Sequence, residues 1–180
     1  MIFEEKTIST ERIYEGKIIN LRKDKVEIRD GGTSSREIVE HGGGAVIIGV
    51  TVDGNIPMVT QYRKAAEKAV LEIPAGRIEK DEDPKEAALR ELREETGYTA
   101  NKIEHLVSAY SSIGYSTEVL YFYLATDLVP GETEFDRGEA IDIKEFSLDE
   151  LYEMALKGEI VDQKTMIAIF MAREKLRGDK

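Results

Sequence analysis

The sequence predicts an α+β (mixed α/β) domain, in which helices cover a β-sheet, preceded by an antiparallel β subdomain. Strand-like segments dominate the first 76 residues, one helix pattern interrupts the strands that follow, and two more helix patterns close the chain. A chain of 180 residues is long enough for one such domain with a small accessory part. We place the boundary between residues 1–42, the subdomain, and residues 43–180.

The N-terminal segment has the pattern of short strands joined by turns. Residues 17–30 and 36–41 carry alternating polar and apolar side chains, and Asp30-Gly31-Gly32 supplies a turn between them. Residues 44–52 and 56–63 are more apolar and flank Asp53-Gly54, which predicts a buried hairpin. Further strands are expected at residues 69–76, 103–110, 118–126 and 141–146.

The helices are marked by their capping residues. Asp83 is a suitable N-cap, Pro84 suits the first helical position, and Gly97 is a natural stop, which together predict a helix between them. Ser147 and Asp162 open two further amphipathic segments near the C-terminus.

Composition and charge narrow the classes of function. With 36 acidic and 25 basic residues the net charge is −11, which disfavours nonspecific binding to nucleic acid or to an anionic membrane. The sequence contains no cysteine, so disulfides, thiolate zinc sites and a cysteine nucleophile are excluded. No apolar run approaches the ~20 residues of a membrane span, and the polar N-terminus does not resemble a signal peptide, so we expect a cytoplasmic protein.

The first helix carries an unusual group of acidic residues. Glu91 and Glu95 are one turn apart and Glu94 flanks them, so the three carboxylates share one side of the helix. Like charges placed this way repel by a few tenths of a kcal/mol per pair. A solvated helix face is the ordinary explanation for a charge run, but a hard divalent cation such as Mg²⁺ would remove the repulsion by binding carboxylate oxygens.

The residues around this helix resemble the signature of the Nudix hydrolases. That signature spaces a glycine, a glutamate and an Arg-Glu-x-x-Glu-Glu-x-Gly segment at fixed intervals, a far more specific pattern than a short glycine motif. The matching residues here are Gly76, Glu82, Arg90, Glu91, Leu92, Glu94, Glu95 and Gly97. Tyr98 departs from the pattern, which usually has an aliphatic residue there.

The resemblance implies a fold, a cofactor and a catalytic set. The fold would be an α/β/α sandwich around a mixed sheet, and the cofactor would be Mg²⁺, with Mn²⁺ as a substitute. The implied metal ligands are Glu91, Glu94, Glu95 and the carbonyl of Ala75. Glu91 and Glu95 thereby act in catalysis, and Arg90 would orient the carboxylates. Glu139 is the implied general base and is preferred over the alternative that the acidic residues of its segment are simply solvated.

Outside this signature the chain resembles the branch of the family that hydrolyses ADP-ribose and nucleotide sugars. The segments that carry this resemblance are residues 36–41, 59–63, 71–79 and 158–165. It implies a small-molecule nucleoside diphosphate substrate and a homodimer formed through the N-terminal strands. The implied substrate contacts are Arg36, Arg63, Glu118 and Tyr115. The two arginines and the tyrosine could instead be ordinary surface residues.

The substrate itself has more than one interpretation. Ile113 stands where ADP-ribose hydrolases commonly carry a proline, while Tyr115 lies near a tyrosine that diadenosine polyphosphate hydrolases favour. ADP-ribose, cleaved to AMP and ribose 5-phosphate, is the first prediction. GDP-mannose or another nucleotide sugar is the next, followed by a diadenosine polyphosphate or an mRNA cap. A ligand sensor without turnover ranks last, because all four signature glutamates are present.

Overall fold

The computed structural model describes residues 2–135 and 140–178, which form two compact units. One unit takes in the chain up to Gly43 together with Tyr110–Val119. The other takes in Gly44–Ala109 and the chain from Leu120 onward. Each unit is described separately below.

The first unit is built on a three-stranded antiparallel sheet, as the sequence predicts. Its strands are β1 (Thr7–Glu15), β2 (Asn20–Glu27) and β3 (Thr33–Glu40), in the order β1-β2-β3. The segment Tyr110–Val119 joins this unit through β3. The Val39 N–H donates to the Tyr115 carbonyl at 2.8 Å, and the Thr117 N–H donates to the Val39 carbonyl at 3.0 Å.

The second unit contains two further sheets. A mixed four-stranded sheet has the order β7-β4-β9-β8, with β4 and β9 parallel and β4 and β7 antiparallel. A three-stranded antiparallel sheet has the order β10-β5-β6. The strands are β4 (Gly44–Gly49), β5 (Asn55–Arg63), β6 (Lys68–Glu72), β7 (Ala75–Arg77), β8 (Thr99–Tyr110), β9 (Val119–Val129) and β10 (Ile141–Ser147).

The predicted hairpin around Asp53-Gly54 is wrong in its pairing. A tight turn is present, because the Gly54 N–H donates to the Thr51 carbonyl at 2.9 Å, but β4 and β5 belong to different sheets. Every residue of β4 is buried, and both edges of the strand are paired, by β7 and β9. A strand covered on both faces in a partly parallel sheet is uniformly apolar, so its pattern does not reveal which strand it pairs with.

The described residues of the second unit also form three helices, with the expected caps. Helix α1 (Pro84–Thr96) begins after Asp83, whose side chain accepts the Lys85 N–H, and ends at Gly97 in the left-handed conformation with φ 76°. Helix α2 (Leu148–Leu156) begins after Ser147, whose hydroxyl accepts the Glu150 N–H. Helix α3 is Gln163–Gly178.

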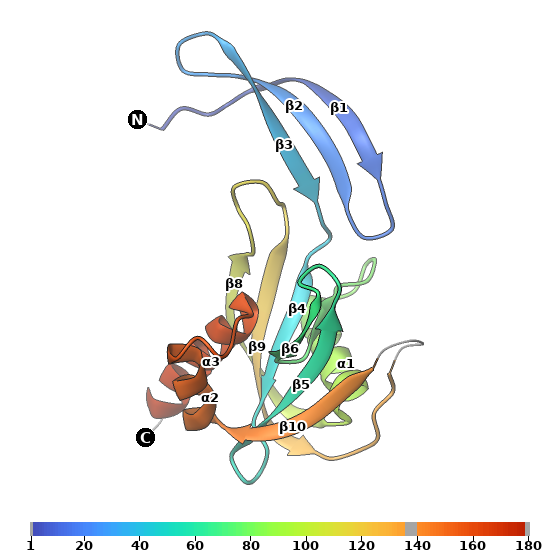
Figure 1. Ribbon diagram of the computed structural model, residues 1–180, viewed down its shortest axis with the longest axis vertical. Coiled ribbons are helices and arrows are strands. Elements are labelled where there is room, and N and C mark those ends of the chain that lie inside the picture. The colour runs from blue at the N-terminus through green and yellow to red at the C-terminus, as the bar shows by residue number, and fades with distance from the viewer. Residues whose placement is uncertain (1, 136–139, 179–180) are drawn as a thin grey trace. The chain divides into compact units, whose positions relative to one another are not determined.

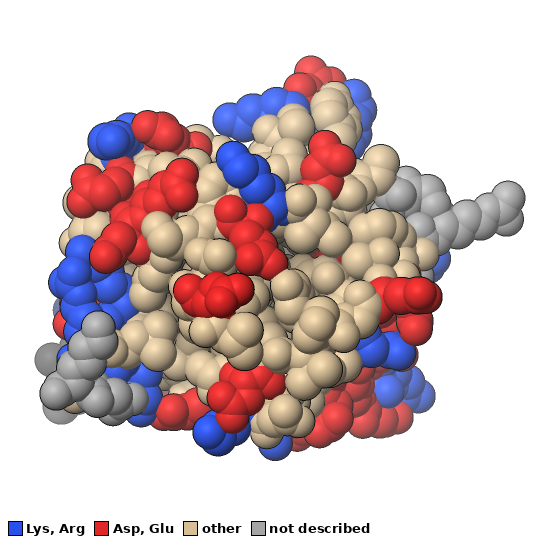
Figure 2. All heavy atoms as spheres, turned by 90° about the horizontal axis from the view of Figure 1, so that it is seen from below, with Lys and Arg blue, Asp and Glu red and all other residues tan. Residues whose placement is uncertain are grey.

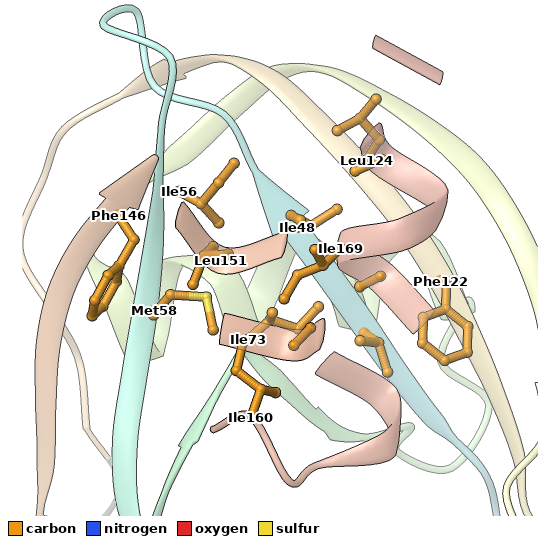
Figure 3. Close-up of a cluster of buried hydrophobic side chains, with 14 residues drawn as sticks. Ile48, Ile56, Met58, Ile73, Phe122, Leu124, Phe146, Leu151, Ile160 and Ile169 are labelled. Carbon is orange, nitrogen blue, oxygen red and sulfur yellow. The ribbon is translucent and has the colours of Figure 1, made fainter. Parts of the chain in front are cut away.

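The residues of β4 alternate between two buried clusters on opposite faces of the sheet. Ala45 and Ile47 pack with Ala87, Ala88 and Leu92 of α1. Val46 and Ile48 pack in the larger cluster with side chains from β5, α2 and α3, among them Ile56, Met58, Leu151 and Ile169 (Figure 3). Helix α1 therefore covers one face and α2 with α3 the other (Figure 1), which confirms the predicted sandwich.

The surface carries the acidic excess of the sequence. On the face drawn in Figure 2, acidic side chains form several groups over the centre, and basic side chains lie mostly towards the margins. An anion approaching this face therefore meets more negative than positive charge. Among the described residues, no helix has the length and apolar composition needed to cross a membrane.

Candidate active site on helix α1

The candidate site lies where the β6–β7 segment faces α1. Leu92 is fully buried against β4, and this contact sets the rotation of α1 about its axis. Glu95, three residues later, lies on the same side of the helix and is only 5 % exposed. A buried carboxylate needs hydrogen bonds. The Ala75 N–H donates to Glu95 Oε2 at 3.2 Å. The helix and the strand residue that the sequence singled out are thus in direct contact.

Arg90 lies among the remaining carboxylates. Its Nη1 donates to Glu91 Oε1 at 2.7 Å and to Glu94 Oε2 at 3.0 Å. Its Nε and Nη2 donate to the two oxygens of Glu82 at 2.9 and 3.1 Å, and Nη2 also donates to the Arg77 carbonyl at 3.0 Å. Arg90 therefore contacts two of the candidate ligands, Glu91 and Glu94, and also Glu82.

The ion pairs of this network shift the pKa values of Arg90 and Glu82. The hydrogen bond to Glu82 is the largest cause that raises the pKa of Arg90 above its ordinary value, and Glu91 and Glu94 add to it. The bonds from Arg90 in turn lower the pKa of Glu82, with a smaller effect from the Glu79 N–H. The Glu82 carboxylate is therefore held by Arg90 and by the backbone N–H of Glu79, three residues earlier.

Gly76 is the residue that lets Glu91 approach the strand. A Cβ placed on Gly76 would lie 1.9 Å from Glu91 Oε1 and 2.1 Å from its carboxyl carbon. Contacts below 3.0 Å do not occur between real atoms of this kind, so any side chain at this position must displace the Glu91 carboxylate. The requirement for glycine is therefore steric, and it concerns a candidate ligand directly.

The donor set fits a divalent metal ion. Carboxylates of Glu91, Glu94 and Glu95 and the backbone of Ala75 are hard oxygen donors, as Mg²⁺ requires. In the structure Arg90 provides the positive charge between Glu91 and Glu94. No group of three or more His, Cys, Asp or Glu side chains in residues 2–135 and 140–178 is arranged as a preformed metal site.

A second ion-pair network lies in the same unit. The Arg63 guanidinium donates from Nε and Nη2 to the two oxygens of Glu72, each at 2.7 Å. Lys164 also binds Glu72, and its Nζ is 2.9 Å from Asp162 Oδ2. The sequence predicted Arg63 as a substrate contact but missed Glu72 and Lys164, although a glutamate inside an apolar strand segment is a signal that could have drawn attention.

Three predicted substrate residues lie in the first unit. Arg36 forms an ion pair with Glu5 and also donates to Ser34 and Ser35. Glu118 lies 3.2 Å from His41 Nδ1 and accepts the Ser111 hydroxyl. The Tyr115 side chain is exposed, and its backbone carbonyl accepts the Val39 N–H of β3. Glu139, the predicted base, lies outside the described residues.

The acidic segment that precedes Glu139 lies against the end of α1. The Glu134 N–H donates to the Glu94 carbonyl at 3.0 Å, and Glu134 pairs with Arg93 at 3.3 Å. Tyr98, the departure from the family signature, donates its hydroxyl to Glu145 of β10 at 2.7 Å. Tyr98 also packs against the apolar cluster beneath α1, so the tyrosine keeps the packing contact and adds a hydrogen bond to the β10-β5-β6 sheet.

These features agree with the family comparison. A model described as the NUDIX domain matches residues 41–168, and one described as the nucleoside diphosphate sugar hydrolase N-terminal domain matches residues 5–39. Because the first match covers more than half of the chain, the protein belongs to the Nudix hydrolase family, and its reaction class is that of a Nudix pyrophosphohydrolase. The family generally uses a divalent metal.

Individual relatives indicate which branch of the Nudix family the chain resembles. The chain is 45 % identical to the methanol dehydrogenase activator of Bacillus methanolicus, over 93 % of this chain and 92 % of that protein. It is 41 % identical to the ADP-ribose pyrophosphatase of Bacillus subtilis, over 98 % of both chains, and 31 % identical to a GDP-mannose pyrophosphatase of Yersinia enterocolitica, over 81 % of this chain and 83 % of that one. A crystal structure of an ADP compounds hydrolase superposes with a TM-score of 0.88 at 22 % identity, covering 99 % of this chain and 97 % of that one, which supports the fold.

Gly76→Ala tests the close approach of Glu91. We expect the variant to fold, because the group that must move is the end of a flexible side chain, and to lose about 100-fold in turnover through the displaced carboxylate. The control is Gly178→Ala, where a Cβ meets nothing within 4 Å. Steady-state kinetics and thermal melting are the measurements. Wild-type turnover in Gly76→Ala would show that the position of Glu91 is unimportant.

Glu72 gives the stability of the protein a defined pH dependence. Burial alone would raise the pKa of Glu72, but hydrogen bonds from Arg63 and Lys164 outweigh it, so the pKa lies below its ordinary value. The stabilisation is fully present above the unfolded pKa of about 4.3 and is lost as pH falls through the folded one. In urea unfolding at decreasing pH, we expect the free energy of unfolding to fall more steeply in wild type than in Glu72→Gln. Parallel curves would contradict this.

Proposed function

We propose that the protein hydrolyses the pyrophosphate bond of ADP-ribose to give AMP and ribose 5-phosphate, with Mg²⁺ as cofactor. The observation that carries the proposal is the acidic face of α1 beside Ala75. Glu95 accepts a hydrogen bond from the Ala75 N–H, and the Glu91 carboxylate lies in van der Waals contact with Gly76. Similarity to two ADP-ribose pyrophosphatases supports this substrate. The identity is 41 % to that of Bacillus subtilis, over 98 % of both chains, and 40 % to that of Mycobacterium tuberculosis, over 87 % of this chain and 77 % of that one.

The chemistry requires charge neutralisation and an aligned water. The negative oxygens of a pyrophosphate repel a nucleophile, so catalysis consists of offsetting that charge and positioning the attack. A bound divalent ion supplies charge neutralisation and a water of lowered pKa. Glu91, Glu94 and Glu95, with the Ala75 carbonyl, would hold the ion, and Arg90 keeps Glu91 and Glu94 in place.

The other predicted residues have roles in binding and proton transfer. Arg63, whose side chain is 42 % exposed, is our candidate for the contact with a substrate phosphate. Arg36, Glu118 and Tyr115 are candidates for contacts with the rest of the nucleotide. Glu139 is the proposed general base. The segment just before it lies against α1 through Glu134, which supports a base from this loop.

A second candidate function follows from the relative with 45 % identity. That protein is an activator of methanol dehydrogenase, and the similarity spans 93 % of this chain. In this interpretation the protein would act on a methanol dehydrogenase. GDP-mannose is a further candidate substrate, supported by the more distant pyrophosphatases of Yersinia.

A substrate panel with a site variant tests these candidates. We expect ADP-ribose to be cleaved faster than GDP-mannose, diadenosine tetraphosphate or NADH, and only with Mg²⁺. Glu95→Gln should lose about 100-fold or more in turnover while remaining folded, because the site loses a fixed charge. The control is Glu86→Gln, an exposed glutamate on the same helix. Wild-type rates in Glu95→Gln would remove this residue from the site.

The outcomes separate the candidates. No phosphate-containing product from any compound would favour a sensor. Faster methanol dehydrogenase turnover on adding the protein, absent with Glu95→Gln, would favour the activator interpretation.

We also propose that the N-terminal sheet forms a homodimer. Strand β1 is an edge strand with all nine residues exposed, and its apolar side chains Ile8, Ile13 and Tyr14 are each about half exposed, at 54 %, 49 % and 56 %. An apolar exposed edge invites pairing with another chain. We expect light scattering to give a dimer for wild type and for the control Val52→Glu, and a monomer for Ile13→Glu. A monomeric wild type would contradict the proposal.

A further inference from the structure

Glu72 is the most deeply buried acidic residue described in the second unit, at 2 % exposure. It lies at the end of β6, and both of its oxygens are occupied. Oε1 accepts Arg63 Nε, and Oε2 accepts Arg63 Nη2 and Lys164 Nζ. A buried carboxylate with two cationic partners remains charged, and this fork-to-fork geometry sets the plane of the guanidinium.

The three residues after Glu72 connect this ion pair to the acidic helix. The Ile73 N–H donates to the Thr165 hydroxyl at 3.0 Å, which ties the segment to the start of α3. The Pro74 carbonyl accepts the Ile47 N–H of β4 at 3.0 Å. The Ala75 N–H then donates to Glu95. Glu72 and Glu95 are therefore joined by a segment in which each of the three residues makes a backbone hydrogen bond.

Arg63 lies within electrostatic reach of the candidate metal ligands. Hydrogen bonds to Glu72 are the main cause that raises the pKa of Arg63, and the charges of Glu95 and Asp162 add to the increase. Glu72 engages Nε and Nη2, so the Nη1 side of the guanidinium is turned away from it. With 42 % of the side chain exposed, Arg63 stays accessible to an anion while the charge of Glu95 acts on it.

Stability alone is a weak explanation for this arrangement. Replacing a buried ion pair with apolar residues of similar volume is often neutral or stabilising, because desolvation offsets the attraction. A fastening between β6 and α3 is already provided by Thr165, which accepts the Ile73 N–H and donates to Asp162. What the Glu72 carboxylate adds is a fixed orientation of Arg63, and orientation matters where an arginine must meet a phosphate.

We propose that Glu72 is a positioning residue that holds Arg63 in the orientation in which it binds a phosphate of the substrate, while Lys164 is the second cationic partner of the Glu72 carboxylate. This rests on the proposed function, in which Arg63 contacts a phosphate. Glu72 itself touches no substrate. Its effect on binding therefore passes through Arg63 and disappears when Arg63 is absent.

A double-mutant cycle of Glu72→Gln and Arg63→Ala tests the proposal. Two measurements are made on every variant: steady-state kinetics with ADP-ribose, and calorimetric binding of ADP, which needs no turnover. We expect Glu72→Gln to raise KM and the Kd for ADP about 10-fold, with kcat changed less than about 3-fold, and Arg63→Ala to raise both constants about 30-fold. The double variant should match Arg63→Ala within about 2-fold.

The control separates this from loss of stability. Ile169→Val trims a fully buried side chain of α3 without touching a polar group, so it should lower the melting temperature and leave KM and Kd unchanged. Any ion pair is expected to show non-additive effects of the two substitutions on the melting temperature. The test of the positioning role is therefore the non-additivity in KM and Kd. If the two effects on Kd multiply to about 300-fold in the double variant, or if Glu72→Gln leaves Kd unchanged, the proposal is overturned.

The same data keep the two proposals apart. A wild type that does not cleave ADP-ribose would refute the proposed substrate, while the ADP-binding cycle would still report on Glu72. A wild type that cleaves ADP-ribose with a multiplicative cycle would refute only the positioning role.

Discussion

The acidic face of α1 depends on one arginine. The five hydrogen bonds of Arg90 to Glu82, Glu91, Glu94 and the Arg77 carbonyl match the five N–H groups of a guanidinium. Two unit charges 4 Å apart interact by about 4 kcal/mol at an effective dielectric constant of 20, so carboxylates this close need a cation between them. A lysine, with a compact charge and three donors, could not serve the same set of acceptors.

The position of that face depends in turn on the packing of β4. Its alternate side chains enter two separate clusters, so the strand is held between α1 on one face and α2 with α3 on the other. Leu92 fixes the rotation of α1, and Glu95 is then buried next to Ala75. Gly76 removes the Cβ that would push Glu91 away. The chemistry of the face is thus set by apolar contacts that lie behind it.

Much of this was accessible from the sequence, and the exceptions have physical causes. Local signals, such as the caps at Asp83 and Gly97, predicted α1 because helix ends are decided by a few neighbouring residues. The predicted pairing of β4 with β5 was wrong because a fully buried strand has no alternating pattern that would indicate its partner. The observed parallel partner, β9, is distant in the sequence. Glu72 and Lys164 were missed because they are 92 residues apart and neither alone suggests an ion pair.

The three arginines that the sequence singled out differ in what they can still bind. Arg90 has its donors committed to carboxylates and a carbonyl, so a substrate phosphate could reach it only by breaking the network that holds the acidic face together. Arg36 is engaged by Glu5 on one side and by Ser34 and Ser35 on the other, so an anion would have to displace Glu5. In the described residues, Arg63 is held by Glu72 through Nε and Nη2, and its side chain is partly exposed. A guanidinium held in this way can donate hydrogen bonds to a phosphate while it keeps those to Glu72. Arg63 is therefore the arginine best suited to bind a substrate phosphate.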